Sequence, residues 1–176
     1  MIFHETNLKD ARLIELNYIR DDRGFFARSF CAEEFAKAGL VSTFVQQNSS
    51  QSLKKGAFRG LHWQRAPHGE VKVMRCLRGA IFQVIVDVRP DSPTFRKWQG
   101  FEITADNRNQ LYVPEGFANG YQALTDEAEV AYFVSRAYTP GAEAGMRYDD
   151  PGIGIELPLP VTVISDKDRA WPDFQA

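Results

Sequence analysis

The segment AIFQVIVDV, residues 80–88, runs directly into RPDSPTF, residues 89–95. The first segment is dense in β-branched and aromatic residues, which favour strands, and the second supplies the proline, aspartate and serine typical of turns. Leu77-Arg78-Gly79 precedes the run and marks a turn on the other side. This stretch therefore predicts a strand bounded by turns at both ends.

Segments of the same character recur at short intervals along the chain. They are EVKVMRC (70–76), WQGFEIT (98–104), QLYVP (110–114), GYQAL (120–124) and EVAYFVSRAY (129–138). Only CAEEFAKAGL (31–40) is rich in helix formers, with Gly39 placed to end a helix. Closely spaced short strands with one or two short helices predict an all-β fold, a jelly-roll-like antiparallel sandwich or barrel.

Composition limits the class of protein further. The 176 residues contain no internal repeat and no Pro/Ser-rich linker, so we expect one domain over residues 1–176. The 23 acidic and 21 basic residues are well mixed, which argues against a nucleic-acid partner. The chain shows neither a signal-peptide layout nor an apolar stretch of membrane-spanning length, so we expect a cytoplasmic protein without a membrane partner. Cys31 and Cys76 lack metal-type spacing and are expected to be free thiols.

Small β-barrels often hold a ligand in the barrel mouth, lined by inward-pointing residues. Lys72 alternates in phase with Met74 and Cys76, and Tyr132 alternates in phase with Val134. Both polar side chains are therefore expected to point inward. A buried lysine is costly without a partner, which makes Lys72 informative. The opposite phase, in which Lys72 is solvated, stays open from periodicity alone.

The heptapeptide FRGLHWQ, residues 58–64, contains one of only three histidines. Strict alternation places Arg59 and His62 on opposite faces of a strand. Gly60 lies between them, and a glycine inside a strand often marks a bulge, which would turn Arg59 toward the side of His62. From this stretch alone, His62 fits a core histidine as well as a catalytic base.

Eight blocks of sequence occur in an order that identifies a family. They are DDRGFF (21–26), VQQNSSQS (45–52), KGAFRGLHWQ (55–64), VKV (71–73), VDVRPDSPTFRKW (86–98), VPEGFANGY (113–121), AYFVSRAYTPGAE (131–143) and ISDKD (164–168). Together they resemble the dTDP-4-dehydrorhamnose 3,5-epimerase family across nearly the whole chain. The resemblance implies a cupin-type jelly roll, a homodimer, a nucleotide-diphosphate sugar substrate, and no metal or organic cofactor.

The resemblance also assigns roles to particular residues. It implies that His62 is the general base, that Asp168 orients it, that Tyr132 is the general acid, and that Lys72 lies beside the keto oxygen. Arg59 would help to hold the sugar diphosphate. The remaining substrate-binding positions implied by the block matches are Arg23 (reaching into the partner's site), Phe26, Gln46, Asn48, Asn119, Tyr138 (stacking on the base), Glu143 and Lys167.

These residue types suit proton transfer next to a ketone. Removing such a proton requires stabilisation of the enolate oxygen, which a lysine in a dry pocket can supply. Histidine, with an ordinary pKa of about 6.5, suits the base, and tyrosine, at about 10, remains protonated and can return a proton. Inversion needs that proton to arrive from the opposite face, so base and acid must flank the sugar ring.

Two other classes of protein compete with this interpretation. His62, His68 and Glu70 form a partial metal set typical of metal-dependent cupins, although no histidine follows to complete it. A sugar-binding cupin without catalytic activity is the second alternative, although the proposed base, carboxylate, lysine and acid are all present.

The chain departs from the family pattern at two contact positions. Where the family usually has a glutamate shortly after RGF, this chain has Ala27 and Arg28, and where the family has the histidine of FAHGF, it has Asn119. An arginine cannot accept a hydrogen bond from a nucleotide base as a carboxylate can. These departures predict an altered base preference, or inversion at only one of C3 and C5.

Overall fold

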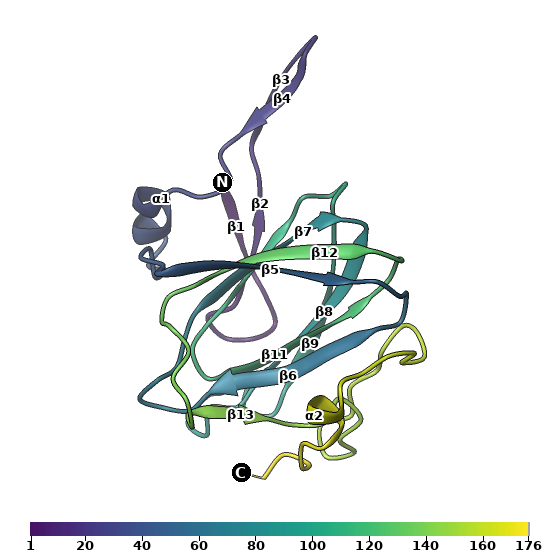
Figure 1. Ribbon diagram of the computed structural model, residues 1–176. Coiled ribbons are helices and arrows are strands. Elements are labelled where there is room, and N and C mark those ends of the chain that lie inside the picture. Colours follow the sequence, from purple (N-terminus) through teal and green to yellow (C-terminus); the bar gives the residue numbers. More distant parts are fainter. Residues whose placement is uncertain (176) are drawn as a thin grey trace.

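The computed structural model describes residues 1–175 and consists of two facing antiparallel sheets with a projecting hairpin (Figure 1). The first sheet has the strand order β1 (Ile2–Glu5), β2 (Arg12–Glu15), β10 (Gln110–Val113), β7 (Lys72–Arg78), β12 (Ala128–Val134) and β5 (Gln46–Ser52). The second has the order β13 (Glu143–Gly145), β6 (Phe58–Gln64), β11 (Phe117–Ala123), β8 (Ala80–Asp87) and β9 (Trp98–Thr104). The hairpin is β3 (Tyr18–Asp21) and β4 (Gly24–Ala27), and the helices are α1 (Ala32–Lys37) and α2 (Asp166–Arg169). The predicted all-β, jelly-roll-like fold is confirmed.

The apolar segments predicted as strands are strands, with shifted ends. The run at 80–88 is β8, and the segment 98–104 is β9 with the predicted bounds. The segment 70–76 begins two residues late, at Lys72, because β7 pairs with β10 only from the Lys72–Val113 register onward. The segment 129–138 ends at Val134, where the pairing of β12 with both β5 and β7 stops. The helix at 31–40 is reduced to the six residues of α1.

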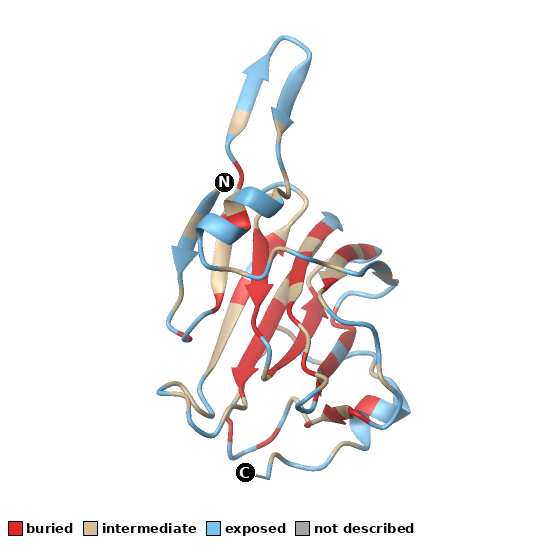
Figure 2. Ribbon diagram, turned by 90° about the vertical axis from the view of Figure 1, so that its left-hand side faces the viewer, coloured by how far each residue is buried: buried red, intermediate tan, exposed pale blue. Residues whose placement is uncertain are grey.

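The main core fills the space between the sheets, and buried residues follow the central strands in Figure 2. Leu111 and Val130 of the first sheet meet Ile85 and Ile103 of the second, and all four are completely buried. The sulfhydryl groups of Cys31 and Cys76 are free, as predicted. None of the helices in residues 1–175 has the length and apolarity to span a bilayer.

The C-terminal segment covers the outer face of the second sheet. Phe58, Leu61 and Val84, which point away from the main core, pack with Met146 and Ile164 in a separate apolar cluster. This packing holds the chain beside β6 and brings α2 against that strand. The outer apolar cluster therefore positions the residues of α2 for the site described below.

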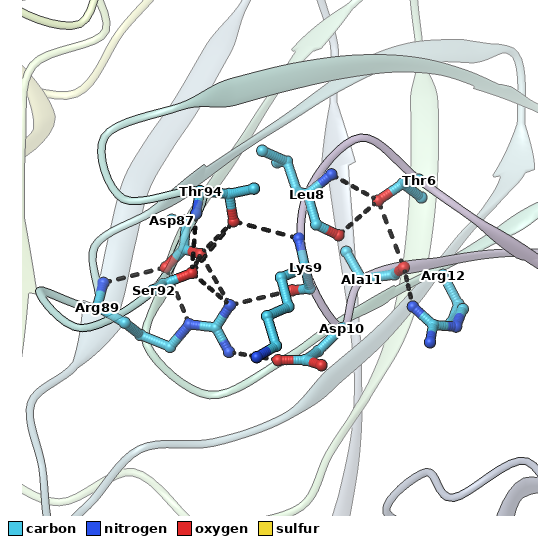
Figure 3. A network of polar contacts seen from close by, with 10 residues as sticks. All are labelled: Thr6, Leu8, Lys9, Asp10, Ala11, Arg12, Asp87, Arg89, Ser92 and Thr94. Carbon is cyan, nitrogen blue, oxygen red and sulfur yellow. Dashed lines mark hydrogen bonds and ion pairs between the residues drawn. The ribbon is translucent and has the colours of Figure 1, made fainter.

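The DSPTF motif has a structural role, shown in Figure 3. The completely buried Asp87 carboxylate accepts hydrogen bonds from Arg89 Nε at 2.9 Å, Ser92 Oγ at 2.5 Å and Thr94 Oγ1 at 2.7 Å. Arg89 also binds Asp10 at 2.8 Å, which fastens the N-terminal loop to the β8–β9 connection. Burial would raise the pKa of Asp87, but these hydrogen bonds outweigh it and the pKa is lowered.

Candidate active site

A pocket of about 760 Å³ lies between the two sheets and is closed on one side by the C-terminal segment. Its principal lining residues are Ser50, Ser52, Lys72, Met74 and Tyr132 of the first sheet, Arg59, His62, Asn119 and Tyr121 of the second, and Ile164, Ser165, Lys167 and Asp168. Seven of the residues predicted for the site therefore share one cavity.

His62 and Asp168 form a hydrogen-bonded pair on one wall. Ser165 caps α2 by accepting from the backbone N–H of Asp168, which fixes the orientation of the helix beside β6. Asp168 Oδ1 lies 2.6 Å from His62 Nε2, and Oδ2 accepts from the N–H of Gly60 at 3.1 Å. Burial opposes ionisation of Asp168, but the hydrogen bonds from His62 and Gly60 outweigh it and lower the carboxyl pKa. Because Nε2 is occupied, Nδ1 is the ring nitrogen left for a ligand.

A bulge in β6 brings Arg59 and His62 to the same side. The register pairs His62 with Asn119 but Arg59 with Tyr121, so two residues of β6 lie opposite one of β11. Gly60 has a φ of +119°, and a Cβ there would lie 2.6 Å from the backbone of the facing strand. Only glycine fits this close approach. The predicted bulge is confirmed, and the Arg59 and His62 side chains both line the pocket.

Tyr132 and Lys72 lie on the opposite wall, on β12 and β7 of the first sheet. Both point inward, as the alternation predicted. Burial raises the pKa of the Tyr132 hydroxyl, against a smaller lowering by the amide of Asn48 on the neighbouring strand. Lys72 Nζ lies 2.8 Å from Oε1 of Glu70, a residue considered from the sequence only as the start of a strand and as part of the partial metal set. The tyrosine and lysine thus face the His62–Asp168 pair across the cavity.

Arg59 reaches toward β5 at another part of the pocket. Its Nε donates to Ser52 Oγ at 3.1 Å, and its NH2 group donates to the carbonyl of Gln51 at 2.7 Å. The hydroxyl of Tyr121 lies 3.2 Å from Ser50 Oγ and also contacts Ser52. These three hydroxyls were not predicted from the sequence, although the alternation of Ser50 and Ser52 in β5 was a signal for an inward polar face.

Lys167 links the pocket to residues at its rim. Its Nζ binds Glu143 Oε2 at 2.6 Å, and this bond raises the pKa of the lysine. Lys167 Nζ also lies 6.0 Å from the centre of the Trp171 ring. Trp171 was not predicted from the sequence as a residue near the site. Glu143 lies on β13, and Tyr138 follows β12 with an exposed side chain. These two residues adjoin the pocket without lining it.

Asn119 is paired with a buried amide. It lies opposite His62 in the register of β11 with β6 and is 8% exposed. Its Oδ1 accepts from Nε2 of the completely buried Gln83 at 2.8 Å. This bond leaves the Asn119 amide nitrogen as the group available to a ligand.

Four positions implied by the resemblance lie away from the pocket of this chain. Arg23 and Phe26 lie on the β3–β4 hairpin, where the Arg23 side chain is 90% exposed and bound to Asp21 (Figure 1). Gln46 begins β5 and lines a separate shallow hollow. Arg28 pairs with Glu34 of α1 at 3.1 Å instead of entering the pocket.

The partial metal set of the sequence analysis does not come together. His62 pairs with Asp168, and Glu70 pairs with Lys72. Within residues 1–175, no group of three or more His, Cys, Asp and Glu side chains is arranged to hold a metal ion.

A jelly roll that places a histidine–carboxylate pair opposite a tyrosine and a lysine defines an acid–base enzyme of the cupin type. The family model described as dTDP-4-dehydrorhamnose 3,5-epimerase matches residues 5–176. The chain belongs to this family, which confirms the resemblance and the class of enzyme, an epimerase acting on a sugar nucleotide.

Individual relatives match over nearly their full lengths. The dTDP-4-dehydrorhamnose 3,5-epimerase of Shigella flexneri is 43% identical over 93% of this chain and 91% of its own. The crystal structure of the Bacillus anthracis enzyme with TDP and PPi bound has a TM-score of 0.94 at 40% identity, covering 98% of this chain and 99% of its own. A 3'-monoepimerase from Streptomyces bikiniensis in complex with dTDP-quinovose has a TM-score of 0.88 at 34% identity, covering 96% and 86%.

Proposed function

We propose that this protein inverts C3 and C5 of a dTDP-linked 4-keto-6-deoxyhexose by removing and returning the protons next to the C4 ketone. The observation that carries the proposal is the placement of His62 and Tyr132 on opposite sheets, facing one pocket. A base and an acid on opposite walls can act on the two faces of a sugar ring held between them. That separation is what inversion requires.

His62 acts as the base through Nδ1, the ring nitrogen that Asp168 leaves unoccupied. Asp168 holds Nε2 in its protonated form and stabilises the imidazolium formed when Nδ1 takes a substrate proton. Its second oxygen is held by Gly60, so the carboxylate cannot rotate without losing a hydrogen bond. The pair therefore fixes both the tautomer and the orientation of the base.

Lys72 and Tyr132 complete the reaction from the other wall. As the proton leaves, negative charge develops on the C4 oxygen, and the Lys72 ammonium stabilises it in a largely buried site. Tyr132 then donates its proton to the carbon from the face opposite His62. Burial raises the pKa of this hydroxyl, so the residue stays protonated at neutral pH until the enolate forms.

The rest of the pocket binds the nucleotide. Arg59, on the His62 wall, is suited to the diphosphate, because a guanidinium matches phosphate oxygens with paired donors. Lys167 with Glu143 and the exposed Tyr138 provide the rim contacts for the nucleoside. Asn48 contributes from β5, where it lies beside Tyr132, whereas Gln46 lines a separate hollow at the start of the same strand.

The functional unit in this proposal is a homodimer, in which Arg23 and Phe26 of each hairpin enter the partner's pocket. Supporting this, the hairpin exposes apolar side chains, with Ile19 69% and Phe26 65% exposed. Closed two-fold dimers are the commonest homo-oligomers. Light scattering should give twice the 20.0 kDa chain mass, and a single-chain mass at micromolar concentration would contradict the dimer.

Proton NMR in deuterated water tests the reaction. The protein is incubated with a dTDP-4-keto-6-deoxyhexose, and loss of the C3 and C5 proton signals is followed together with the couplings that report inversion. Deuterium at both carbons with inverted couplings is expected. Absence of exchange at both would reject the proposal and leave a sugar-nucleotide-binding protein.

Inversion at a single carbon is the second candidate, favoured by Asn119. This residue lies opposite the base and presents a neutral amide where the family has histidine. An amide cannot take or give a proton as an imidazole does, so one of the two exchange steps would lose support. The same NMR experiment distinguishes the candidates, because a monoepimerase would deuterate and invert one carbon only.

A further inference from the structure

Glu70 lies just before β7 and has an environment unusual for a loop carboxylate. Its side chain is 7% exposed, less than the 15% of Lys72, and its Oε1 lies 2.8 Å from Lys72 Nζ. Within residues 1–175, its second oxygen, Oε2, has no hydrogen-bond partner although it is buried. The carboxylate is therefore held in the protein interior by one strong contact, with the ammonium group of the pocket lysine.

The pair has a definite geometry with respect to the cavity. Lys72 lines the pocket, whereas Glu70 lies behind the wall and is not among its lining residues. An ammonium group has three N–H donors, and one of them is used by Oε1. The contact behind the wall thus leaves two donors for a ligand and limits the rotation of the side chain that carries them.

We propose that Glu70 is a positioning residue, which holds the Lys72 ammonium protonated and directed at the substrate's keto oxygen. This inference rests on the function proposed above. A buried ammonium tends to lose its proton unless a negative partner compensates for the lost hydration. A neutral lysine would offer a weaker hydrogen bond to the developing oxyanion, because hydrogen bonds from charged donors are roughly twice as strong as neutral ones.

The charge of Glu70 also acts on the acid of the same wall. It contributes to raising the pKa of Tyr132, although burial is the main cause. One carboxylate therefore pairs with the lysine of this wall and favours the protonated form of its tyrosine. No other residue in the described part of the chain pairs with Lys72.

Two substitutions separate the hydrogen bond from the charge. Glu70→Gln keeps an oxygen that can accept from Lys72 but removes the charge, and Glu70→Ala removes both. Because Lys72 acts mainly as charge develops, we expect kcat to fall about tenfold in Glu70→Gln and about a hundredfold in Glu70→Ala, with KM changed less than about twofold. Glu127→Gln is the matched control, since Glu127 pairs with Arg78 at the surface and should retain wild-type kinetics.

A second measurement tests the Glu70–Lys72 ion pair in the absence of substrate. Lysines react with acetic anhydride only when unprotonated, so the acetylation rate of Lys72, measured by peptide mass spectrometry against exposed Lys97, reports its protonation. We expect this relative rate to rise at least about fivefold in Glu70→Gln and to stay constant in Glu127→Gln. If the wild type exchanges no substrate proton, the epimerase proposal fails, while the acetylation rates still decide whether Glu70 holds Lys72 protonated.

The outcomes that overturn the inference are specific. Unchanged acetylation of Lys72 in Glu70→Gln rejects the pairing role. A loss of activity that appears as raised KM, or that accompanies a lowered melting temperature without faster acetylation, assigns Glu70 a structural role instead.

Discussion

Replacing Asp168 with asparagine tests the tautomer of His62. The carboxylate has two different neighbours, the Gly60 N–H at Oδ2 and His62 Nε2 at Oδ1. Asparagine keeps one oxygen, and the Gly60 donor requires that oxygen at the Oδ2 position. The amide NH2 then faces Nε2 and donates to it, so the imidazole must carry its proton on Nδ1. A protonated Nδ1 cannot accept a proton from the sugar.

The expected reduction in the exchange rate of Asp168→Asn follows from the same contacts. Restoring the active tautomer requires the amide to flip, which sets its NH2 against the Gly60 N–H in a site 5% exposed and costs about 1–3 kcal/mol. The flipped amide also lacks the charge that supports the imidazolium, worth about another 1–2 kcal/mol. The sum of about 2–5 kcal/mol corresponds to a rate reduction of roughly 30- to 5,000-fold.

The assay is the initial rate of deuterium incorporation into substrate at C3 and C5. Asp166→Asn is the control, because Asp166 lies on the same helix, is exposed and does not line the pocket. It should exchange at the wild-type rate. If Asp168→Asn, folded as judged by its melting temperature, exchanged at more than half that rate, the assignment of Nδ1 as the base would be wrong.

Three further perturbations extend the test. His62→Ala should reduce proton exchange by about two to four powers of ten, whereas Tyr132→Phe should retain some exchange and lose inverted product, which the same NMR spectra distinguish. Asp87→Asn should lower the free energy of unfolding by about 1–3 kcal/mol in urea, because it removes the buried charge that Arg89, Ser92 and Thr94 bind and leaves Arg89 with Asp10 as its remaining ion-pair partner. Since the folded pKa of Asp87 is lowered, its stabilisation is present above the unfolded pKa and is lost as pH falls through the folded value, so the difference between variant and wild type should shrink in acid. Arg23→Ala and His62→Ala should each be poorly active alone but recover activity when refolded together, because a mixed dimer has one intact site; no recovery would contradict a shared site.

The sequence predicted strands where apolar side chains alternate and missed them where they do not. β8 and β9 contain buried apolar residues at regular spacing, so the repeat typical of a strand could be recognised in the sequence. β5 has the sequence QQNSSQS and shows no such period. It is a strand because it pairs with β12 over seven residues and turns Ser50 and Ser52 toward a polar pocket instead of an apolar core. A strand that faces a binding site lacks the pattern by which strands are recognised.

Residues of the candidate site could be predicted from the sequence where the local backbone geometry determined the direction of their side chains. Alternation placed Lys72 and Tyr132, and the glycine bulge placed Arg59 beside His62. Glu70 was considered only as the first residue of the predicted strand 70–76 and as a metal ligand, yet two facts pointed to it as the partner of Lys72: it lies two residues before a lysine expected to be buried, and such a lysine needs a carboxylate. The requirement for a partner was recognised, but the partner was not sought among the sequence neighbours.

The distribution of charge around the pocket supports the proposed position of the diphosphate at Arg59. Three of its basic side chains each hold a carboxylate: His62 with Asp168, Lys72 with Glu70, and Lys167 with Glu143. Lys54, also a lining residue, forms no ion pair within the described residues. Arg59 likewise has no carboxylate partner there, because its partners are the neutral Ser52 hydroxyl and the Gln51 carbonyl. Its positive charge is therefore not neutralised by the protein. In the proposed function, a diphosphate at Arg59 would compensate this charge without breaking an ion pair and would leave the other three pairs intact for the roles proposed for them in proton transfer and nucleoside binding.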